Sequence, residues 1–280
     1  MKKTRTIISL AVALLGTCSF AGAVYEESSP WNGFYIGANA GYLWSSSNRV
    51  TNTGLGFFAN SSGLPASRAI AFSLAELGRA ELFGRSNGAI GGGQIGYNST
   101  FMNQLVIGLE ADLDGIGQSN NNFDFINTFS PQGLGTYNAH IVINKKLDYM
   151  GALKGRLGFL ISPSFLIYGA GGYSYGGASL KSSYSITSTS AIFSPINEHR
   201  NKSTILSGWN VGGGVEWLFY PAWSMKLEYT YYNLGPINTH VDATQFLATT
   251  PPVAFATATL NTLALYSNSA IRVGVNYHFC

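Results

Sequence analysis

The stretch just before the C-terminal Cys280 constrains the fold most. From Ile271 to Phe279 the sequence reads Ile-Arg-Val-Gly-Val-Asn-Tyr-His-Phe, so apolar residues alternate strictly with polar residues or glycine. Such alternation predicts a β-strand with two chemically different faces. The apolar face ends in Tyr277 and Phe279, and an aromatic pair at a strand end is typical of a bilayer interface. We therefore predict a transmembrane strand whose apolar face meets lipid and whose polar face, with Arg272, meets a lumen.

The composition favours transmembrane strands over the other fold classes. Only 10% of the 280 residues are charged, whereas soluble domains usually have about a quarter. No run approaches the roughly 20 apolar residues that a membrane-spanning helix requires, which argues against a helical membrane protein. A soluble β-sandwich is the remaining alternative, and such a protein would appear in the periplasmic fraction without detergent.

The N-terminus has the organisation of an export signal. Lys2, Lys3 and Arg5 form a basic region, an apolar run follows at residues 7–15, and Ala21-Gly22-Ala23 matches an A-x-A cleavage site. We predict a signal peptide at residues 1–23, with cleavage after Ala23, or alternatively after Ala21. A short periplasmic segment at 24–30 and an outer-membrane β-barrel at 31–280 follow.

The two cysteines allow one alternative to a plain signal peptide. Cys18 would fit a lipoprotein signal, but Thr17 stands where a small Gly or Ala is expected. Cleavage after residue 23 removes Cys18 and leaves Cys280 alone, so we expect no intramolecular disulfide. It also removes three of the 16 basic residues and no acidic residue, which leaves 13 of each sign. This neutral balance argues against a nucleic-acid partner.

Eight segments show the two-residue alternation of a membrane strand. The predicted strands are Trp31–Ser45, Gly88–Ser99, Leu105–Asp114, Leu147–Phe159, Phe165–Ser179, Trp209–Phe219, Trp223–Tyr231 and Ile271–Phe279. Short and long connections alternate between them. This asymmetry predicts an all-β, antiparallel up-and-down transmembrane barrel with short periplasmic turns and long extracellular loops.

The four long connections are predicted as loops, at about 46–86, 115–144, 180–204 and 236–266. Roughly helical spacing of Ile70, Leu74, Leu77 and Leu82 predicts a short helix over Ser67–Phe83, packed on the barrel rim or alternatively inside the lumen. The last connection is rich in Ala, Thr and Leu. The neighbouring strands therefore extend beyond the membrane, or an extra extracellular hairpin folds over residues 241–265.

Charged side chains on the polar faces of five predicted strands point into one lumen. They are Glu110, Asp112, Asp114, Asp148, Lys154, Arg156, Glu216, Lys226, Glu228 and Arg272. Because side chains fill an eight-stranded barrel, we predict that these groups pair in a salt-bridge core. A narrow ion path is the alternative. No cleft would admit a substrate, so we predict no enzyme and no catalytic residue.

Three histidines fall one in each of three predicted extracellular loops. If His140, His199 and His240 converge above the barrel, their imidazoles could hold haem iron or a transition metal. The alternative is that they are unrelated surface residues. We otherwise expect no cofactor, and a haem titration of the wild type and of the triple alanine variant would distinguish the two.

Several strand motifs resemble a known family. They are Trp31-Asn32-Gly33-Phe34-Tyr35-Ile36-Gly37, Gly92-Gly93-Gln94-Ile95-Gly96-Tyr97-Asn98, Gly108-Leu109-Glu110-Ala111-Asp112, Gly155-Arg156-Leu157-Gly158, Leu227-Glu228-Tyr229-Thr230-Tyr231 and Val273-Gly274-Val275-Asn276-Tyr277-His278-Phe279. They are similar to motifs of small surface-antigen barrels in the outer-membrane β-barrel superfamily, which includes opacity-like and haem-binding proteins. The match covers nearly every predicted strand and none of the long loops.

The resemblance implies a non-enzymatic protein of the Gram-negative outer membrane. Its expected role is structural or antigenic, with loops available for adhesion to host or matrix ligands, and the alternative is a haem-binding or narrow, porin-like barrel. Expected partners are outer-membrane lipid and the barrel assembly machinery, for which Tyr277 and Phe279 resemble the C-terminal signal. Such barrels usually end on the aromatic residue itself, whereas here Cys280 follows Phe279.

Overall fold

A computed structural model describes residues 29–46, 49–60, 65–83, 86–102, 104–118, 122–130, 135–189, 194–248 and 254–279. Its elements are β1 (Gly33–Ser45), β2 (Arg49–Asn60), α1 (Pro65–Gly78), β3 (Ala80–Phe83), β4 (Asn87–Phe101), β5 (Leu105–Gln118), β6 (Asn122–Phe129), β7 (Tyr137–Ser162), β8 (Phe165–Ser188), β9 (Ile196–Tyr220), β10 (Trp223–Ala248) and β11 (Ala254–His278). No helix among these residues is long and apolar enough to cross a membrane.

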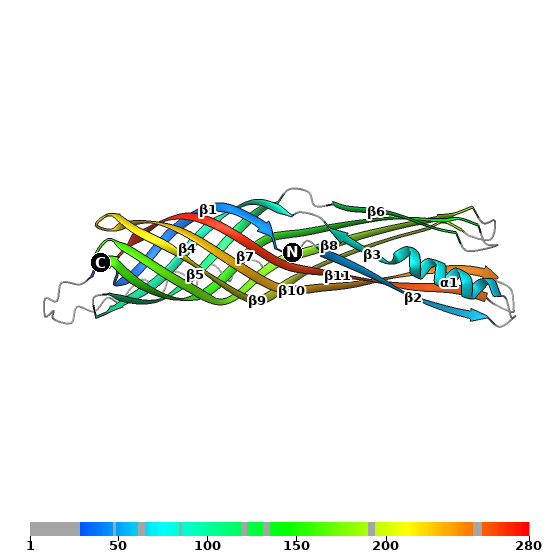
Figure 1. The fold of residues 1–280 in the computed structure, drawn as a ribbon, viewed down its shortest axis with the longest axis horizontal. Coiled ribbons are helices and arrows are strands. Elements are labelled where there is room, and N and C mark those ends of the chain that lie inside the picture. Colours follow the sequence, from blue (N-terminus) through cyan, green and yellow to red (C-terminus); the bar gives the residue numbers. More distant parts are fainter. Residues whose placement is uncertain are drawn as a thin grey trace, which may run out of the picture.

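Eight of the described strands close into a cylinder. The order is β1-β4-β5-β7-β8-β9-β10-β11, and β11 pairs back with β1 (Figure 1). Arg272 on β11 lies opposite Gly41 on β1 and Glu228 on β10. The predicted all-β antiparallel barrel is therefore confirmed, and its C-terminal strand closes it against the first strand.

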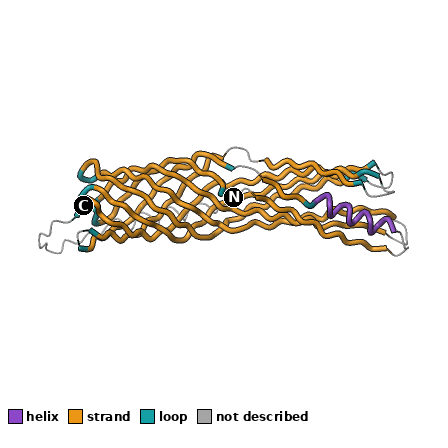
Figure 2. The backbone as a smooth tube through the Cα atoms, viewed as in Figure 1, coloured by secondary structure: helices purple, strands orange, loops and turns teal. Residues whose placement is uncertain are grey.

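The outer wall of the cylinder is apolar, and a girdle of aromatic side chains borders it at each end. Alternate residues such as Phe34 and Leu109 are 58% and 63% exposed, while their strand neighbours point inward. Phe34 and Trp44 are ten residues apart on β1, which matches the 9–11 residues of a tilted transmembrane strand. Turns of two or three residues join β4 to β5, β7 to β8 and β9 to β10 at one end (Figure 2).

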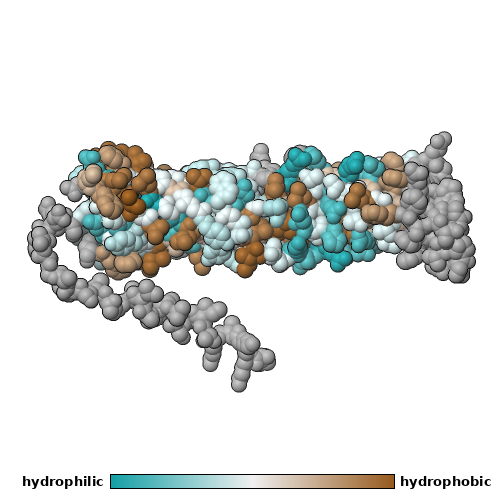
Figure 3. Space-filling model, turned by 90° about the horizontal axis from the view of Figure 1, so that it is seen from below, coloured by the Kyte–Doolittle hydropathy of each residue, from teal (hydrophilic) through white to brown (hydrophobic). Residues whose placement is uncertain are grey.

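The strands continue far beyond the cylinder at the other end. β7 has 26 residues, which corresponds to about 85 Å of strand at ~3.3 Å per residue. We call this projecting part the extension. It consists of β2, α1, β3, β6 and residues 137–148, 178–188, 196–207, 236–248 and 254–266. The largest hydrophilic areas in Figure 3 lie over it.

The prediction of long loops was therefore largely wrong. The described parts of the four connections are mainly strand, and β10 stays paired with β11 from Pro236 opposite Leu265 to Ala248 opposite Ala254. This confirms the alternative in which the neighbouring strands extend beyond the membrane, rather than the extra hairpin folded over residues 241–265. On β7, Tyr137, Ala139 and Ile141 are buried, whereas the alternating Asn138 and His140 are polar and exposed. Because the outer face of these strands meets water rather than lipid, its polar residues made the sequence look like loop.

The extension divides into two sheets, β6-β7-β8-β9 and β10-β11-β2-β3. Pairing between β9 and β10 ends at Trp209 opposite Asn233. Just beyond, Gly235 has a φ of 78° and Pro236 has no N–H to donate, so β10 turns away from β9. The amine of Lys202 on β9 bridges the gap by donating to the carbonyl oxygen of Asn238 at 2.7 Å.

Helix α1 lies between the two sheets. A Cβ at Gly56 would lie 2.6 Å from the Ala71 carbonyl oxygen, and one at Gly54 would overlap the Ala75 backbone, so the helix rests directly on β2. From the opposite sheet, the Asn127 amide donates to the Glu76 carbonyl at 3.3 Å. The predicted helix is confirmed up to Gly78, but its predicted last residues, including Leu82, form β3 instead. The helix packs inside the extension rather than on the barrel rim or in the membrane-level lumen.

Candidate functional site: a charge network in the barrel lumen

Nine of the ten charged residues predicted to face the lumen form one buried cluster. We call it the lumen network: Glu110, Asp112, Asp114, Lys154, Arg156, Glu216, Lys226, Glu228 and Arg272. Five strands supply it, because alternation turns every second residue of β5, β7, β9, β10 and β11 inward. No member is more than 6% exposed.

Two lysines hold the centre of the network. The amine of Lys154 lies 2.8 Å from Glu110 Oε1, 2.8 Å from Asp112 Oδ2 and 3.0 Å from Glu228 Oε1. The amine of Lys226 contacts both oxygens of Glu110, at 2.9 and 3.0 Å. An ammonium group has three donors, so Lys154 satisfies three carboxylates with all of them.

Two arginines extend the network toward the two ends of the lumen. Arg156 Nη2 lies 2.6 Å from Glu216 Oε2, and its guanidinium stacks 4.0 Å from the ring centre of Tyr168. Arg272 Nη1 lies 2.5 Å from Asp114 Oδ2, while its Nη2 lies 2.5 Å from Glu228 Oε1. Both arginines thus connect carboxylates on different strands, which fixes those strands relative to one another.

Neutral side chains on the same inward faces complete the network. The Tyr35 hydroxyl donates to Glu110 Oε2 at 2.8 Å, and the Tyr168 hydroxyl donates to Glu228 Oε2 at 2.9 Å. Ser224 and Asn276 each donate to Glu216 Oε1 at 2.6 Å. These four residues were not predicted as part of the site, although inward alternation on their strands was the signal that could have identified them.

Trp31 covers the end of the lumen beside the short turns, within a buried cluster that includes Leu160 and Leu166. Trp31 is fully buried, and its indole N–H donates to the carbonyl of Pro163 at 2.9 Å, in the turn on the opposite side of the cylinder. Its ring also lies edge-on to His278, with centroids 5.6 Å apart. Trp31 was predicted as the first strand residue, but it lies in the turn before β1 and forms the floor of the lumen.

Apolar side chains cover the other end. Above Arg272, the inward positions belong to a continuous hydrophobic core that includes Leu43, Ile90, Met150 and Tyr232. This core continues into the extension around α1. The network is consequently enclosed between Trp31 at one end of the lumen and these apolar side chains at the other.

Asp148 is the one predicted network residue that lies elsewhere. A β-bulge between Leu147 and Tyr149 shifts the register of β7, so Leu147 is buried and Asp148 faces solvent. Its carboxylate pairs with Lys146 at 2.5 Å on the surface. The assignment of Asp148 to the lumen and of Leu147 to lipid was therefore wrong, because one extra residue reverses every following side chain.

The three histidines do not converge. His140 lies on β7 and contacts Asp124 Oδ1 at 2.6 Å, while His199 and His240 lie on β9 and β10 in different sheets of the extension. Within the described ranges, no three His, Cys, Asp or Glu side chains form a group able to hold a metal ion. This arrangement agrees with the alternative that the three histidines are unrelated, exposed surface residues.

The C-terminal aromatic residues lie in the aromatic girdle at the end of the cylinder where the short turns are. Phe279 is 51% exposed, its ring centroid lies 5.1 Å from that of Tyr277, and its backbone N–H donates to the carbonyl of Phe34 at 2.8 Å. Tyr277 also contacts Trp223, with centroids 5.2 Å apart. Cys280 lies outside the described residues.

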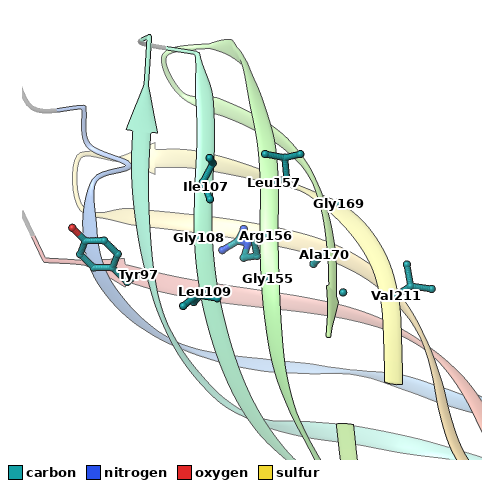
Figure 4. Close-up of a pocket in the computed structure, with 11 residues that line it drawn as sticks. Tyr97, Ile107, Gly108, Leu109, Gly155, Arg156, Leu157, Gly169, Ala170 and Val211 are labelled. Carbon is teal, nitrogen blue, oxygen red and sulfur yellow. The ribbon is translucent and has the colours of Figure 1, made fainter. Parts of the chain in front are cut away.

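One hollow lies on the outer wall of the cylinder. It has a volume of about 670 Å³, and small residues such as Gly155 and Gly171 form its base between Tyr97, Leu109 and Val211 (Figure 4). These side chains belong to the apolar outer face. The hollow therefore meets lipid and contains no arrangement of polar groups for chemistry.

Known proteins match the chain over most of its length. The family model for the outer membrane protein β-barrel domain matches residues 9–279. The 31 kDa outer-membrane immunogenic protein of Brucella melitensis is 25% identical, with 98% of each chain covered. Among solved structures, OprG from Pseudomonas aeruginosa has 13% identity and a TM-score of 0.34, covering 89% of this chain and 97% of that one. Neisserial surface protein A has 12% identity and a TM-score of 0.31, covering 89% and 98%.

Proposed function

Because this chain belongs to the outer membrane protein β-barrel domain family, we propose that it is a closed, non-enzymatic barrel that displays its extension at the cell surface. It is a protein of the Gram-negative outer membrane, and lipid surrounds its cylinder. The proposed role combines a structural contribution to the envelope with contact between the extension and extracellular partners, including host or matrix ligands.

One observation carries this proposal: the lumen is filled and covered at both ends. Lys154 joins three carboxylates at its centre, Trp31 covers one end, and the hydrophobic core around Leu43 covers the other. Moving an ion through this space would require breaking several buried ion pairs, each costly to separate. The arrangement favours rigidity over transport.

The extension is the surface that we propose for recognition. Its strands project well beyond the apolar belt, and α1 with the core around Ile70 gives the two sheets a packed interior. A rigid, water-exposed structure suits binding because little conformational entropy is lost on contact. One relative of this chain is an immunogenic outer-membrane protein, which agrees with a surface-exposed role.

The two alternatives have less support. A narrow pore would need to pass the network and the Trp31 floor, and haem ligation by His140, His199 and His240 would need them to approach one another. We therefore propose no cofactor and no catalytic residue.

We also propose how the chain reaches the membrane. Residues 1–23 would serve as a signal peptide, residues 24–30 as a short periplasmic segment, and residues 31–280 as the barrel. Phe279 and Tyr277 would provide the C-terminal signal for the barrel assembly machinery.

Planar-bilayer recordings of the refolded mature protein test the closed lumen. We expect no steady channels from the wild type over long recordings at high salt. Reproducible unitary conductance of the wild type would overturn the proposal.

Sidedness can be tested separately in whole cells. In a Cys280→Ser background, Thr244→Cys in the extension should react with a membrane-impermeant maleimide on intact cells. Ser162→Cys, beside the β7–β8 turn, should react only after the outer membrane is permeabilised. The reverse labelling pattern would show the opposite orientation.

A further inference from the structure

The outer face of the β10-β11-β2 sheet contains a polar groove in the extension. Figure 1 shows these three strands side by side beyond the cylinder. His240, Asn261 and Thr53 form one row across the strands, and Asn238, Leu263 and Thr51 form the next. Together they line a hollow of about 450 Å³.

The groove differs from the rest of the same face in its hydrogen bonding. Further from the membrane, Thr259 donates to Asp242 at 2.7 Å, and Thr244 and Thr257 are 3.0 Å apart, so those side chains satisfy each other. In the part of the chain that the structure describes, the side chains of His240, Asn261 and Thr53 have no such partners. They are free to bind a ligand.

One edge of the groove is held in place. Arg49 donates from Nε to the Thr51 hydroxyl at 3.2 Å, and its Nη2 pairs with Glu81 at 2.7 Å. The backbone of Asn238 at the opposite edge accepts the bond from Lys202. The row of polar groups between these edges is consequently pre-organised on a rigid sheet.

The chemistry of the lining selects a class of ligand. The residues that line the groove include no Asp, Glu, Lys or Arg, and the guanidinium of Arg49 beside Thr51 is already paired with Glu81. Phosphate, sulfate and hard cations therefore lack free charged partners among these residues. Carboxamide, imidazole and hydroxyl groups both donate and accept hydrogen bonds. Leu263, which is 39% exposed, adds an apolar patch between them. Neutral saccharides present this same mixture, with hydroxyls around an apolar C–H face.

We propose that this groove binds neutral saccharide units, with Asn261, His240 and Thr53 bonding the hydroxyls and Leu263 contacting the C–H face. This rests on the proposed function, because the groove must lie outside the cell. The saccharide has two conceivable sources: polysaccharide anchored in the same membrane, or a glycan presented from outside. Both offer the same chemistry to the groove.

The test uses refolded full-length mature protein in a zwitterionic detergent without a sugar headgroup. The probes are an array of defined neutral, sialylated and sulfated oligosaccharides, and the delipidated oligosaccharide of the producing bacterium's lipopolysaccharide. We expect the wild type to bind neutral members of one or both sets. The double variant Thr53→Val/Asn261→Leu should bind them at least about ten-fold more weakly, because two hydrogen-bonding groups are lost.

The matched control is Thr244→Val/Thr257→Val, which changes the same face outside the groove and should bind like the wild type. A heat-shift gel confirms that each variant is a folded barrel. Binding only to the bacterium's own oligosaccharide, or only to the array, supports the proposal and identifies the source. Binding restricted to sulfated or sialylated members, no binding at all, or equal binding by the groove variant would overturn it, without affecting the conductance and labelling results.

Discussion

Lys154 on β7 lies directly opposite Glu110 on β5, and their side chains form a 2.8 Å ion pair that is fully buried in the lumen. Strand register and ion pairing therefore specify the same alignment. A shift of β7 by one residue would turn Lys154 toward lipid and leave three carboxylates without their shared cation.

Replacing this lysine should destabilise the barrel strongly. We expect Lys154→Met to lower the free energy of unfolding in detergent micelles by about 3–5 kcal/mol, because it leaves buried carboxylates uncompensated. Urea titration followed by tryptophan fluorescence would measure it. Lys146→Met, which removes the exposed pair with Asp148, should cost less than about 1 kcal/mol. Equal effects of the two changes would contradict a stabilising role for the network.

The contact between α1 and β2 predicts a second effect, confined to the extension. Gly54→Ala should force the helix away from the sheet, because the added Cβ overlaps the Ala75 backbone. We expect a loss of about 1–3 kcal/mol. Limited proteolysis should then cleave the extension faster while the membrane barrel stays intact. Gly115→Ala is the control, since its Cβ would have its nearest neighbour at 3.9 Å, and unchanged proteolysis of Gly54→Ala would disprove this packing.

The buried Lys145 predicts how the stability of the extension depends on pH. Its amine lies 4.6 Å from the ring centre of Tyr266, and burial lowers the pKa of Lys145 to about 8. In the unfolded chain the lysine pKa is about 10.4, so the unfolded state binds more protons between these values and stability should rise with pH from about 8 to about 10.4. The full cost of burial, up to about 3 kcal/mol, is present below pH 8.

Unfolding titrations of wild type and Lys145→Met between pH 7 and pH 10.5 would measure this effect. The difference in stability between the two proteins should shrink by up to about 3 kcal/mol as the pH rises. Lys181→Met, at an exposed position on β8, should follow the wild type. A pH-independent difference between wild type and Lys145→Met would show that the amine does not titrate in this range.

The last residues predict an assembly phenotype. Deleting Cys280 alone should leave membrane insertion unchanged. Deleting both Phe279 and Cys280 should abolish insertion, because the aromatic side chain that follows β11 is then lost from the girdle beside the short turns. Heat-modifiable barrel in outer-membrane fractions is the measurement. Equal insertion of both truncations would remove Phe279 from the proposed signal.

Alternation predicted much of the cylinder and of its network. Residues such as Glu110, Lys226 and Arg272 were assigned to the correct face because lipid excludes charge from the other one. Asp148 was misplaced because a bulge leaves no trace in a two-residue pattern. Apart from α1 and the extended β10–β11 pair, the extension was missed for a different reason: outside the membrane the outer face of a strand is polar, and loops are polar too. The Trp31 floor depends on a turn geometry that local sequence does not encode.

The gap between β9 and β10 affects how copies of this protein coexist in one membrane. Both strands present unpaired backbone edges there, and such edges can join neighbouring molecules into continuous sheets. Arg200 and Lys202 lie on the inward face of β9 at that edge, opposite Ser182 and Leu180 of β8. An incoming strand would have to bury these cations. These charged side chains therefore oppose edge-to-edge pairing between neighbouring copies.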